Sequence, residues 1–276
     1  MTTYNCFSTS VRGGSHVASG LPLQDANLSE CNAWVALCAV ADGHGSAKYF
    51  RSDVGARLAC QTAVNKLRHF VEANRDYQAL TSGVDEKLWR LRMAILAEWQ
   101  QQTEDYTRLH PFTDSDLAAS SDDFVARLDY DVRQPYGTTL LAAAVTSDYC
   151  LCIKLGDGEA TVTCNGVTQL LDFGDDELCS NFTYSMCGDD AAERMQIRYY
   201  PLDGVTNVAL GLCTDGLSGA LADETTLVRV MDGYARELAT DKQTATTAIA
   251  EQLQTVSTKS YSKDDVSVAF VWADCD

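Results

Sequence analysis

The chain has 276 residues, of which 46% are hydrophobic and only 4 are proline, a composition typical of a globular protein rather than a disordered one. Its formal net charge of -18 argues against a nucleic-acid partner, because contact with the phosphate backbone requires a clustered basic surface. The 11 cysteines include no Cys-x-x-Cys pair, so neither a zinc knuckle nor a thioredoxin-type motif is supported.

The N-terminal segment Met1–Ser10 has neither the apolar core nor the leading positive charge of a signal peptide. No apolar stretch approaches the ~20 residues that are needed to span a bilayer. We therefore expect a cytoplasmic protein with reduced thiols that does not associate with membranes. We also expect it to act as a monomer.

Two long helices are predicted in the first half of the chain. Apolar residues recur at helical spacing in Ser46–Val71, and again from Asp85 to about Thr103. The stretch Asp114–Asp131 is acidic and rich in serine, which predicts mostly loop with one short helix near Phe124–Leu128.

The second half of the chain changes to a strand pattern and then returns to helices. Asn165-Gly166 is a strong signal for a two-residue hairpin turn. The segment Asp172–Pro201 is rich in Gly and Asp, which predicts an irregular surface excursion between strands. Strands are predicted at Ala33–Ala41, Thr138–Thr146, Tyr149–Leu155, Glu159–Cys164, Val167–Leu171, Val208–Thr214 and Val266–Trp272, and helices at Glu224–Ala239 and Thr244–Ser257.

The order of these elements indicates the fold class. Helices come in pairs between groups of strands, which is not the alternation of a parallel βαβ fold. The pattern favours an α+β sandwich in which two antiparallel sheets lie in the middle and pairs of helices cover the outside. No repeat, low-complexity tract or Pro/Ser-rich linker divides the chain, so we expect residues 1–276 to form a single domain.

Four of the strand-like runs meet an aspartate at one edge: Asp42, Asp157, Asp215 and Asp264. Three of the four are followed by glycine, and an isolated Asp-Gly pair is usually a turn, because glycine supplies a positive φ. A carboxylate at the end of a buried strand is costly unless something pairs with it. Four such carboxylates from across the chain are best explained by convergence on divalent cations.

The candidate ligands are all oxygens, which select Mg²⁺ or Mn²⁺ over zinc or copper. Two such ions can share a water, lower its pKa and present hydroxide to a phosphoryl group. His44 lies two residues beyond Asp42 and could protonate a leaving alkoxide. The alternative for His44 is an ordinary surface histidine or one at a helix N-terminus.

Six motifs occur in one order along nearly the whole chain: Gln24-Asp25, Val40-Ala41-Asp42-Gly43-His44-Gly45, Gly137-Thr138-Thr139, Gly156-Asp157-Gly158-Glu159, Thr214-Asp215-Gly216-Leu217 and Lys263-Asp264-Asp265-Val266-Ser267-Val268. In these motifs the chain resembles the metal-dependent type 2C family of Ser/Thr protein phosphatases. The fold that this resemblance implies is a pair of antiparallel sheets flanked by helix pairs, in agreement with the pattern of elements.

The resemblance also implies metal-binding roles. Asp42 would bridge two metal ions, and the carbonyl of Gly43 would bind one of them. Asp215 and Asp264 would complete the ligand set of the other ion. Asp157, together with Asp215, matches the place where some family members hold a third, weaker ion.

Two further roles follow from the same resemblance. Asp25 would bind metal-coordinated water, and His44 would act as the general acid. The implied activity is hydrolysis of phosphoserine or phosphothreonine in a protein substrate by a hydroxide that bridges two Mn²⁺ or Mg²⁺ ions. The variable segment at about residues 172–201 corresponds to a flap beside the active site and would bear on substrate choice.

The first motif departs from the family pattern in two ways. Gln24 stands where eukaryotic members usually carry Glu, and a neutral amide oxygen coordinates a cation more weakly. Gly20 stands where a phosphate-binding Arg is expected, so that Arg12 or His16 would have to supply positive charge instead. These departures favour a divergent, bacterial-like branch of the family.

Two alternative functions remain open. The chain could be a catalytically weak relative that binds phosphoproteins in a regulatory role, as Gln24 and the missing Arg would allow. It could also be a metal-dependent hydrolase of a small phosphate ester, because resemblance in fold does not fix the function.

Overall fold

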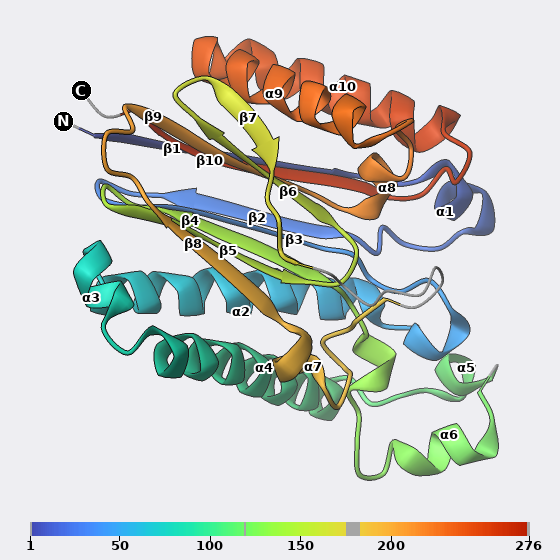
Figure 1. Cartoon of the computed structure of the whole chain (residues 1–276). Coiled ribbons are helices and arrows are strands. Elements are labelled where there is room, and N and C mark those ends of the chain that lie inside the picture. Colours follow the sequence, from blue (N-terminus) through green and yellow to red (C-terminus); the bar gives the residue numbers. More distant parts are fainter. Residues whose placement is uncertain (1, 119, 175–182, 275–276) are drawn as a thin grey trace.

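The computed structural model describes residues 2–118, 120–174 and 183–274. Two five-stranded antiparallel sheets are stacked face to face, and a pair of long helices covers the outer face of each sheet (Figure 1). The predicted α+β sandwich with outer helix pairs is therefore confirmed. Strands from the two ends of the chain pair with each other, which brings the first and last motifs together.

The two sheets have similar sizes but different strand orders. The first contains, in spatial order, β1 (Thr3–Val11), β10 (Val266–Asp274), β9 (Asn207–Cys213), β6 (Glu159–Cys164) and β7 (Val167–Leu170). The second contains β2 (Ala26–Cys31), β3 (Ala36–Ala41), β4 (Leu140–Val145), β5 (Tyr149–Leu155) and β8 (Gln196–Pro201).

Four long helices form the outer layers, and shorter ones lie mainly in the connections at one end of the sandwich (Figure 1). The long helices are α2 (Ser52–Ala73), α4 (Val84–Leu109), α9 (Glu224–Thr240) and α10 (Lys242–Lys259). The short ones are α1 (Gly14–Ser19), η1 (Ala47–Tyr49), α3 (Tyr77–Thr81), α5 (Asp114–Leu117), α6 (Asp122–Arg127), η2 (Gln134–Tyr136), α7 (Ala191–Arg194) and α8 (Asp215–Ser218).

The central strands are buried on both faces, and their alternating side chains enter two different cores. In β3, Leu37 packs against the helices α2 and α4, whereas Cys38 packs against the other sheet. In β10, Phe270 packs against α9 and α10, whereas Ala269 and Val271 face the sandwich interior. The strands that carry the aspartates are thus packed on both faces of their sheets.

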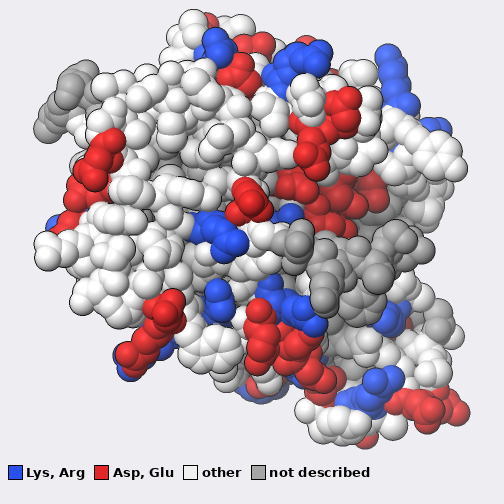
Figure 2. All heavy atoms as spheres, viewed as in Figure 1, with Lys and Arg blue, Asp and Glu red and all other residues white. Residues whose placement is uncertain are grey.

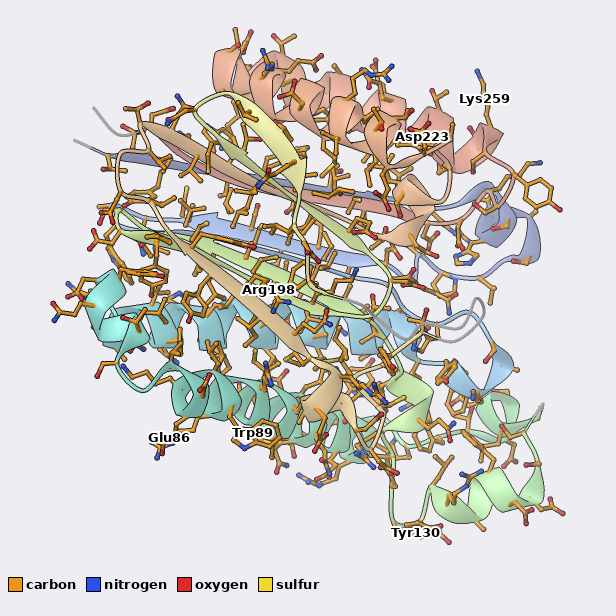
Figure 3. All side chains as sticks on the ribbon, in the orientation of Figure 1. Glu86, Trp89, Tyr130, Arg198, Asp223 and Lys259 are labelled. Atoms are coloured by element: carbon orange, nitrogen blue, oxygen red, sulfur yellow. The ribbon has the colours of Figure 1, made fainter. Side chains whose placement is uncertain are left out.

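Two tryptophans on α4 show which face of this helix is buried. Trp99 is fully buried, and its indole N–H donates to the carbonyl oxygen of Gly55 on α2 at 3.0 Å. Trp89 lies on the outer face of α4 and is 41% exposed (Figure 3). None of the helices in the described ranges is both long and apolar enough to cross a membrane.

Most predicted elements are present, with ends shifted by a few residues, but some predictions were wrong. The segment Asp172–Pro201 is not irregular throughout, because it contains α7 and the edge strand β8; residues 175–182 of it lie outside the described residues. The predicted loop Asp114–Asp131 contains two short helices instead of one. The elements β1, α1 and β2 were not predicted.

Candidate active site

The four strand-edge aspartates lie at the same end of the sandwich. Asp42 follows β3, Asp157 follows β5, Asp215 follows β9, and Asp264 precedes β10. Antiparallel pairing aligns these ends, as the opposition of Cys213 to Val268 shows. All four aspartates line one cavity of about 730 Å³, together with His44. Figure 2 shows acidic side chains gathered at this end of the molecule, on the right of the view.

The backbone of Asp42 is fixed by the two threonines that precede β4. The N–H of Thr139 and the hydroxyl of Thr138 both donate to the carbonyl oxygen of Asp42, at 2.9 and 2.8 Å. The N–H of Asp42 donates in turn to the Thr139 hydroxyl at 2.9 Å. The Gly-Thr-Thr motif therefore positions the aspartate that is central to the site, a role that its sequence alone did not reveal.

The glycines that follow Asp42 and Asp215 are required by close packing rather than by a turn. Neither has a positive φ. A Cβ on Gly43 would lie 2.6 Å from the carbonyl oxygen of Gln24, and one on Gly216 would lie 1.9 Å from that of Asp265. Real side chains do not tolerate such distances, so each glycine lets two segments of the site meet backbone to backbone.

Asp25 is buried behind the cavity and does not line it. One of its carboxylate oxygens, Oδ2, accepts hydrogen bonds from the hydroxyls of Thr214 and Ser267, both at 2.8 Å. Burial nevertheless raises the pKa of Asp25 well above its ordinary value, and the negative charge of Asp265 adds to this. A cation in front of Asp25 would relieve the cost of this buried charge.

Asp42 and Asp215 are in the same electrostatic situation. Burial raises the pKa of Asp42 well above its ordinary value, and the charges of Asp25 and Asp215 raise it further. Burial also raises the pKa of Asp215, whose Oδ1 is buried without a hydrogen-bond partner. Desolvated like charges with an unpaired oxygen fit a divalent cation, and the donor set consists of oxygens only.

The four strand-edge aspartates line one cavity, but their carboxylates are not yet arranged at the spacing of metal ligands. In the parts of the chain that the structure describes, no three His, Cys, Asp or Glu side chains meet at metal-binding spacing. The side chain of Asp264 is 46% exposed, and its Oδ1 accepts the N–H of Asp265 at 2.9 Å. Small side-chain rotations would therefore accompany the entry of a cation.

His44 lines the cavity beside Asp42, as predicted. Its backbone N–H donates to the carbonyl oxygen of Gly137 at 3.1 Å, and its ring contacts the ring of Tyr49 at 4.7 Å between centroids. Burial lowers the pKa of His44 to about 4, with the negative charge of Asp157 opposing this shift. The imidazole is therefore neutral at pH 7 in this structure.

Asp265 has a structural role that differs from that of its neighbour Asp264. It is buried, and its two carboxylate oxygens accept the backbone N–H groups of Gly13 and Gln24, both at 2.6 Å. It thereby ties the start of β10 to the segment that leads into Asp25. The resemblance gave a metal-binding role to Asp264 alone, and this structural role of Asp265 was not predicted.

Gln24 also lies behind the cavity rather than in its wall. Its amide nitrogen donates to the Ser52 hydroxyl at 2.7 Å, whereas its amide oxygen Oε1 is buried without a hydrogen-bond partner. This free oxygen is the atom that would reach a cation or an ordered water. Whether Gln24 ligates a metal stays a prediction.

Arg12 and His16 do not line the cavity, contrary to the expectation that one of them contacts phosphate. The Arg12 guanidinium donates to the carbonyl oxygens of His16 and Leu21. The His16 ring lies between two carboxylates, with its Nδ1 2.9 Å from Asp265 and its Nε2 3.5 Å from Asp264. Both residues are already engaged in holding the segment before Gln24.

Other cations do reach the cavity. Among the described residues, the Lys and Arg side chains in its wall are Lys48 on η1 and Arg127 at the end of α6. Tyr130, in the loop after α6, belongs to the same wall and is 77% exposed (Figure 3). This wall was not identified from the sequence, because mostly loop was predicted for Asp114–Asp131 and no site residue was assigned there or to Lys48.

Charged and hydroxyl groups also fix other side chains that line the cavity. The Arg133 guanidinium bridges Asp131 and Asp189, at 2.7 and 2.8 Å. Thr183 donates its hydroxyl to Asp157, which fixes the orientation of that carboxylate. The segment after residue 182 therefore contributes directly to the cavity wall.

Comparison with known proteins agrees with this geometry. The family model described as protein phosphatase 2C matches residues 12–254, which is most of the chain. A search of curated proteins finds no significant match.

Solved structures with the same fold include several bacterial phosphatases. The catalytic domain of the serine/threonine protein phosphatase PstP, in complex with two manganese ions, has a TM-score of 0.58 at 17% identity over 100% of both chains. A serine/threonine phosphatase from S. agalactiae has a TM-score of 0.55 at 17% identity and covers 98% of this chain and 99% of its own. PppA from Pseudomonas aeruginosa, a regulatory component of the T6SS, has a TM-score of 0.55 at 16% identity, over 97% of this chain and 96% of its own.

The ordered motifs, the two stacked sheets, the aspartates at one end of them and the family match lead to one conclusion: the chain belongs to the protein phosphatase 2C family of serine/threonine protein phosphatases.

Proposed function

We propose that this protein hydrolyses phosphoserine and phosphothreonine in protein substrates with the help of bound Mn²⁺ or Mg²⁺. The observation that supports this most strongly is the convergence of Asp42, Asp157, Asp215 and Asp264 on one cavity. Burial and neighbouring aspartates raise the pKa of Asp42 and of Asp215, so their negative charge is costly without a cation nearby. Divalent cations would supply that charge.

The residues divide naturally between two principal ions and a weaker third. Asp42, the Gly43 carbonyl, Asp215 and Asp264 would hold the first two, and Asp157 with Asp215 would hold the third. When bound, the ions supply a bridging hydroxide as nucleophile and neutralise charge on the phosphoryl group. The open side of the cavity, lined by Tyr130 and other exposed residues, leaves room for a protein segment.

The remaining roles belong to the chain's own side chains. Asp25, held by Thr214 and Ser267, would accept a hydrogen bond from metal-coordinated water. His44, which lines the cavity with Asp42, would deliver a proton to the leaving serine or threonine oxygen. Because its imidazole is neutral at pH 7, it must first take up a proton, and the negative charge of a bound phosphate would raise its pKa toward that range.

The discriminating experiment is a substrate panel. We expect the protein to release phosphate from phosphoserine and phosphothreonine peptides when Mn²⁺ is present and to stop when it is chelated. Faster hydrolysis of small esters than of any phosphopeptide would favour the small-ester hydrolase. Calorimetric Mn²⁺ binding without turnover of any phosphopeptide would favour the regulatory binding module.

A further inference from the structure

The cavity contains far more negative than positive charge. Among the described residues that line it, seven are aspartates: Asp42, Asp131, Asp157, Asp189, Asp190, Asp215 and Asp264. A phosphate monoester is itself an anion, so it needs positive charge from the protein as well as from bound cations. The two candidate side chains in the wall are Lys48 and Arg127.

Lys48 lines the same cavity as His44 and contacts the ring that packs on it. It belongs to η1, which begins three residues after His44, and its ammonium lies 4.7 Å from the centroid of the Tyr49 ring. The same ring contacts the His44 ring at 4.7 Å. The Tyr49 ring packs closely against Gly137, because a Cβ on this glycine would lie only 2.6 Å from Tyr49 Cδ1.

The positive charge of Lys48 acts on two residues that line the cavity. It lowers the pKa of His44, after the larger effect of burial, and it also acts on Cys187 in the opposite wall. Lys48 forms no ion pair with any carboxylate in the described ranges, even though seven line the same cavity. Its ammonium is therefore available to an incoming anion.

Arg127 is less well placed. It is the last residue of α6 and lies four residues before Asp131, whose pKa its charge helps to lower; like Lys48, it is exposed. The structure gives it no contact with His44 or with the aspartates at the strand ends. Arg127 therefore serves as a matched control: a cation in the same cavity but on its outer wall.

We propose that Lys48 is the side chain that contacts the substrate phosphate in this protein, with its ammonium held beside His44 by the Tyr49 ring. The proposal rests on the proposed function for its substrate class, but phosphate binding by Lys48 can be measured without turnover. Lys48 takes the place of Arg12 and His16 as the candidate phosphate-binding residue, because the structure places those two outside the cavity.

The test uses the full chain loaded with Mn²⁺ and inorganic phosphate as the probe. Lys48→Met keeps the apolar stem of the side chain and removes the charge, Lys48→Arg keeps the charge, and Arg127→Met removes the control cation. Calorimetry measures phosphate binding directly, and competition against p-nitrophenyl phosphate measures it independently. Thermal melting and Mn²⁺ titration of each variant check that fold and metal affinity are intact.

We expect Lys48→Met to weaken phosphate binding about tenfold, corresponding to the loss of one charge-assisted hydrogen bond. Lys48→Arg should restore binding to within about threefold of the wild type, and Arg127→Met should stay within the same limit. Normal phosphate affinity in Lys48→Met, an equal loss in Arg127→Met, or no phosphate binding by the wild type would overturn the proposal. Phosphate binding that depends on Lys48 in a protein that turns over no phosphopeptide would instead refute only the proposed function.

Discussion

Gly216 lies so close to the carbonyl oxygen of Asp265 that a Cβ on this glycine would be 1.9 Å from it. The two residues come from different motifs, one after β9 and one at the start of β10. Their contact places Asp215 beside Asp264 in the cavity wall. The geometry of the candidate metal site thus depends on a backbone contact that only glycine permits.

Gly216→Ala should therefore damage both stability and metal binding. The added methyl must push the start of β10 away, so we expect a destabilisation of about 1–3 kcal/mol and a loss of Mn²⁺ affinity. The matched control is Gly233→Ala in the middle of α9, where nothing lies within 4 Å of the new Cβ. That control should stabilise the protein by about 0.5–1 kcal/mol, because alanine is the better helix former. Equal melting temperatures of Gly216→Ala and the wild type would contradict the account.

Asp215→Asn should separate stability from metal binding. The amide removes a buried like charge and gives Asp42 a hydrogen-bond donor, so the metal-free variant should melt at or above the temperature of the wild type. In the wild type, Mn²⁺ at a hundredfold excess over its dissociation constant should add about 2.7 kcal/mol of stability. We expect this gain to disappear in Asp215→Asn.

The control for that experiment is Asp189→Asn, in which the altered side chain is 95% exposed. It should leave the Mn²⁺-induced rise in melting temperature unchanged, because an exposed ion pair with Arg133 contributes little to stability. A rise that persists in Asp215→Asn would show that the cation binds elsewhere.

The hydroxyl of Ser267 should stabilise the carboxylate of Asp25. Ser267→Ala removes a donor from a buried charged acceptor, which costs about 1–3 kcal/mol. In an Asp25→Ala background the same substitution should cost much less, and chemical denaturation of the four proteins measures the difference. Ser10→Ala is the control, since Ser10 bonds to Ser267 but not to Asp25. Additive effects of the two substitutions would contradict the proposed role of Ser267.

The parts of the fold with strong hydrophobic patterns could be predicted from the sequence. The strands at Tyr149–Leu155 and Glu159–Cys164 have the predicted bounds, because their residues are largely buried. The strand β1 was missed because most of its residues are only partly buried, so that it has no continuous apolar run. β8 was missed for the same reason, since it is an edge strand with a mixed sequence.

Some residues of the candidate site could likewise be predicted from the sequence, and others could not. The strand-edge aspartates could be found because each follows or precedes a buried run, and buried carboxylates are rare. Arg12 could not be excluded from sequence, because its engagement with the carbonyl oxygens of His16 and Leu21 depends on the folded loop. Lys48 could not be recognised, because its place in the cavity depends on the packing of Tyr49 against Gly137.

The most direct test of the account is the rate of Mn²⁺-dependent phosphate release from a phosphothreonine peptide by the wild type, Asp42→Ala and Asp189→Asn. The account predicts that Asp42→Ala lowers the rate by more than about a hundredfold, because the central carboxylate of the site is lost. Asp189→Asn should keep the rate of the wild type. Phosphate release that continues without added metal and survives Asp42→Ala would contradict the account.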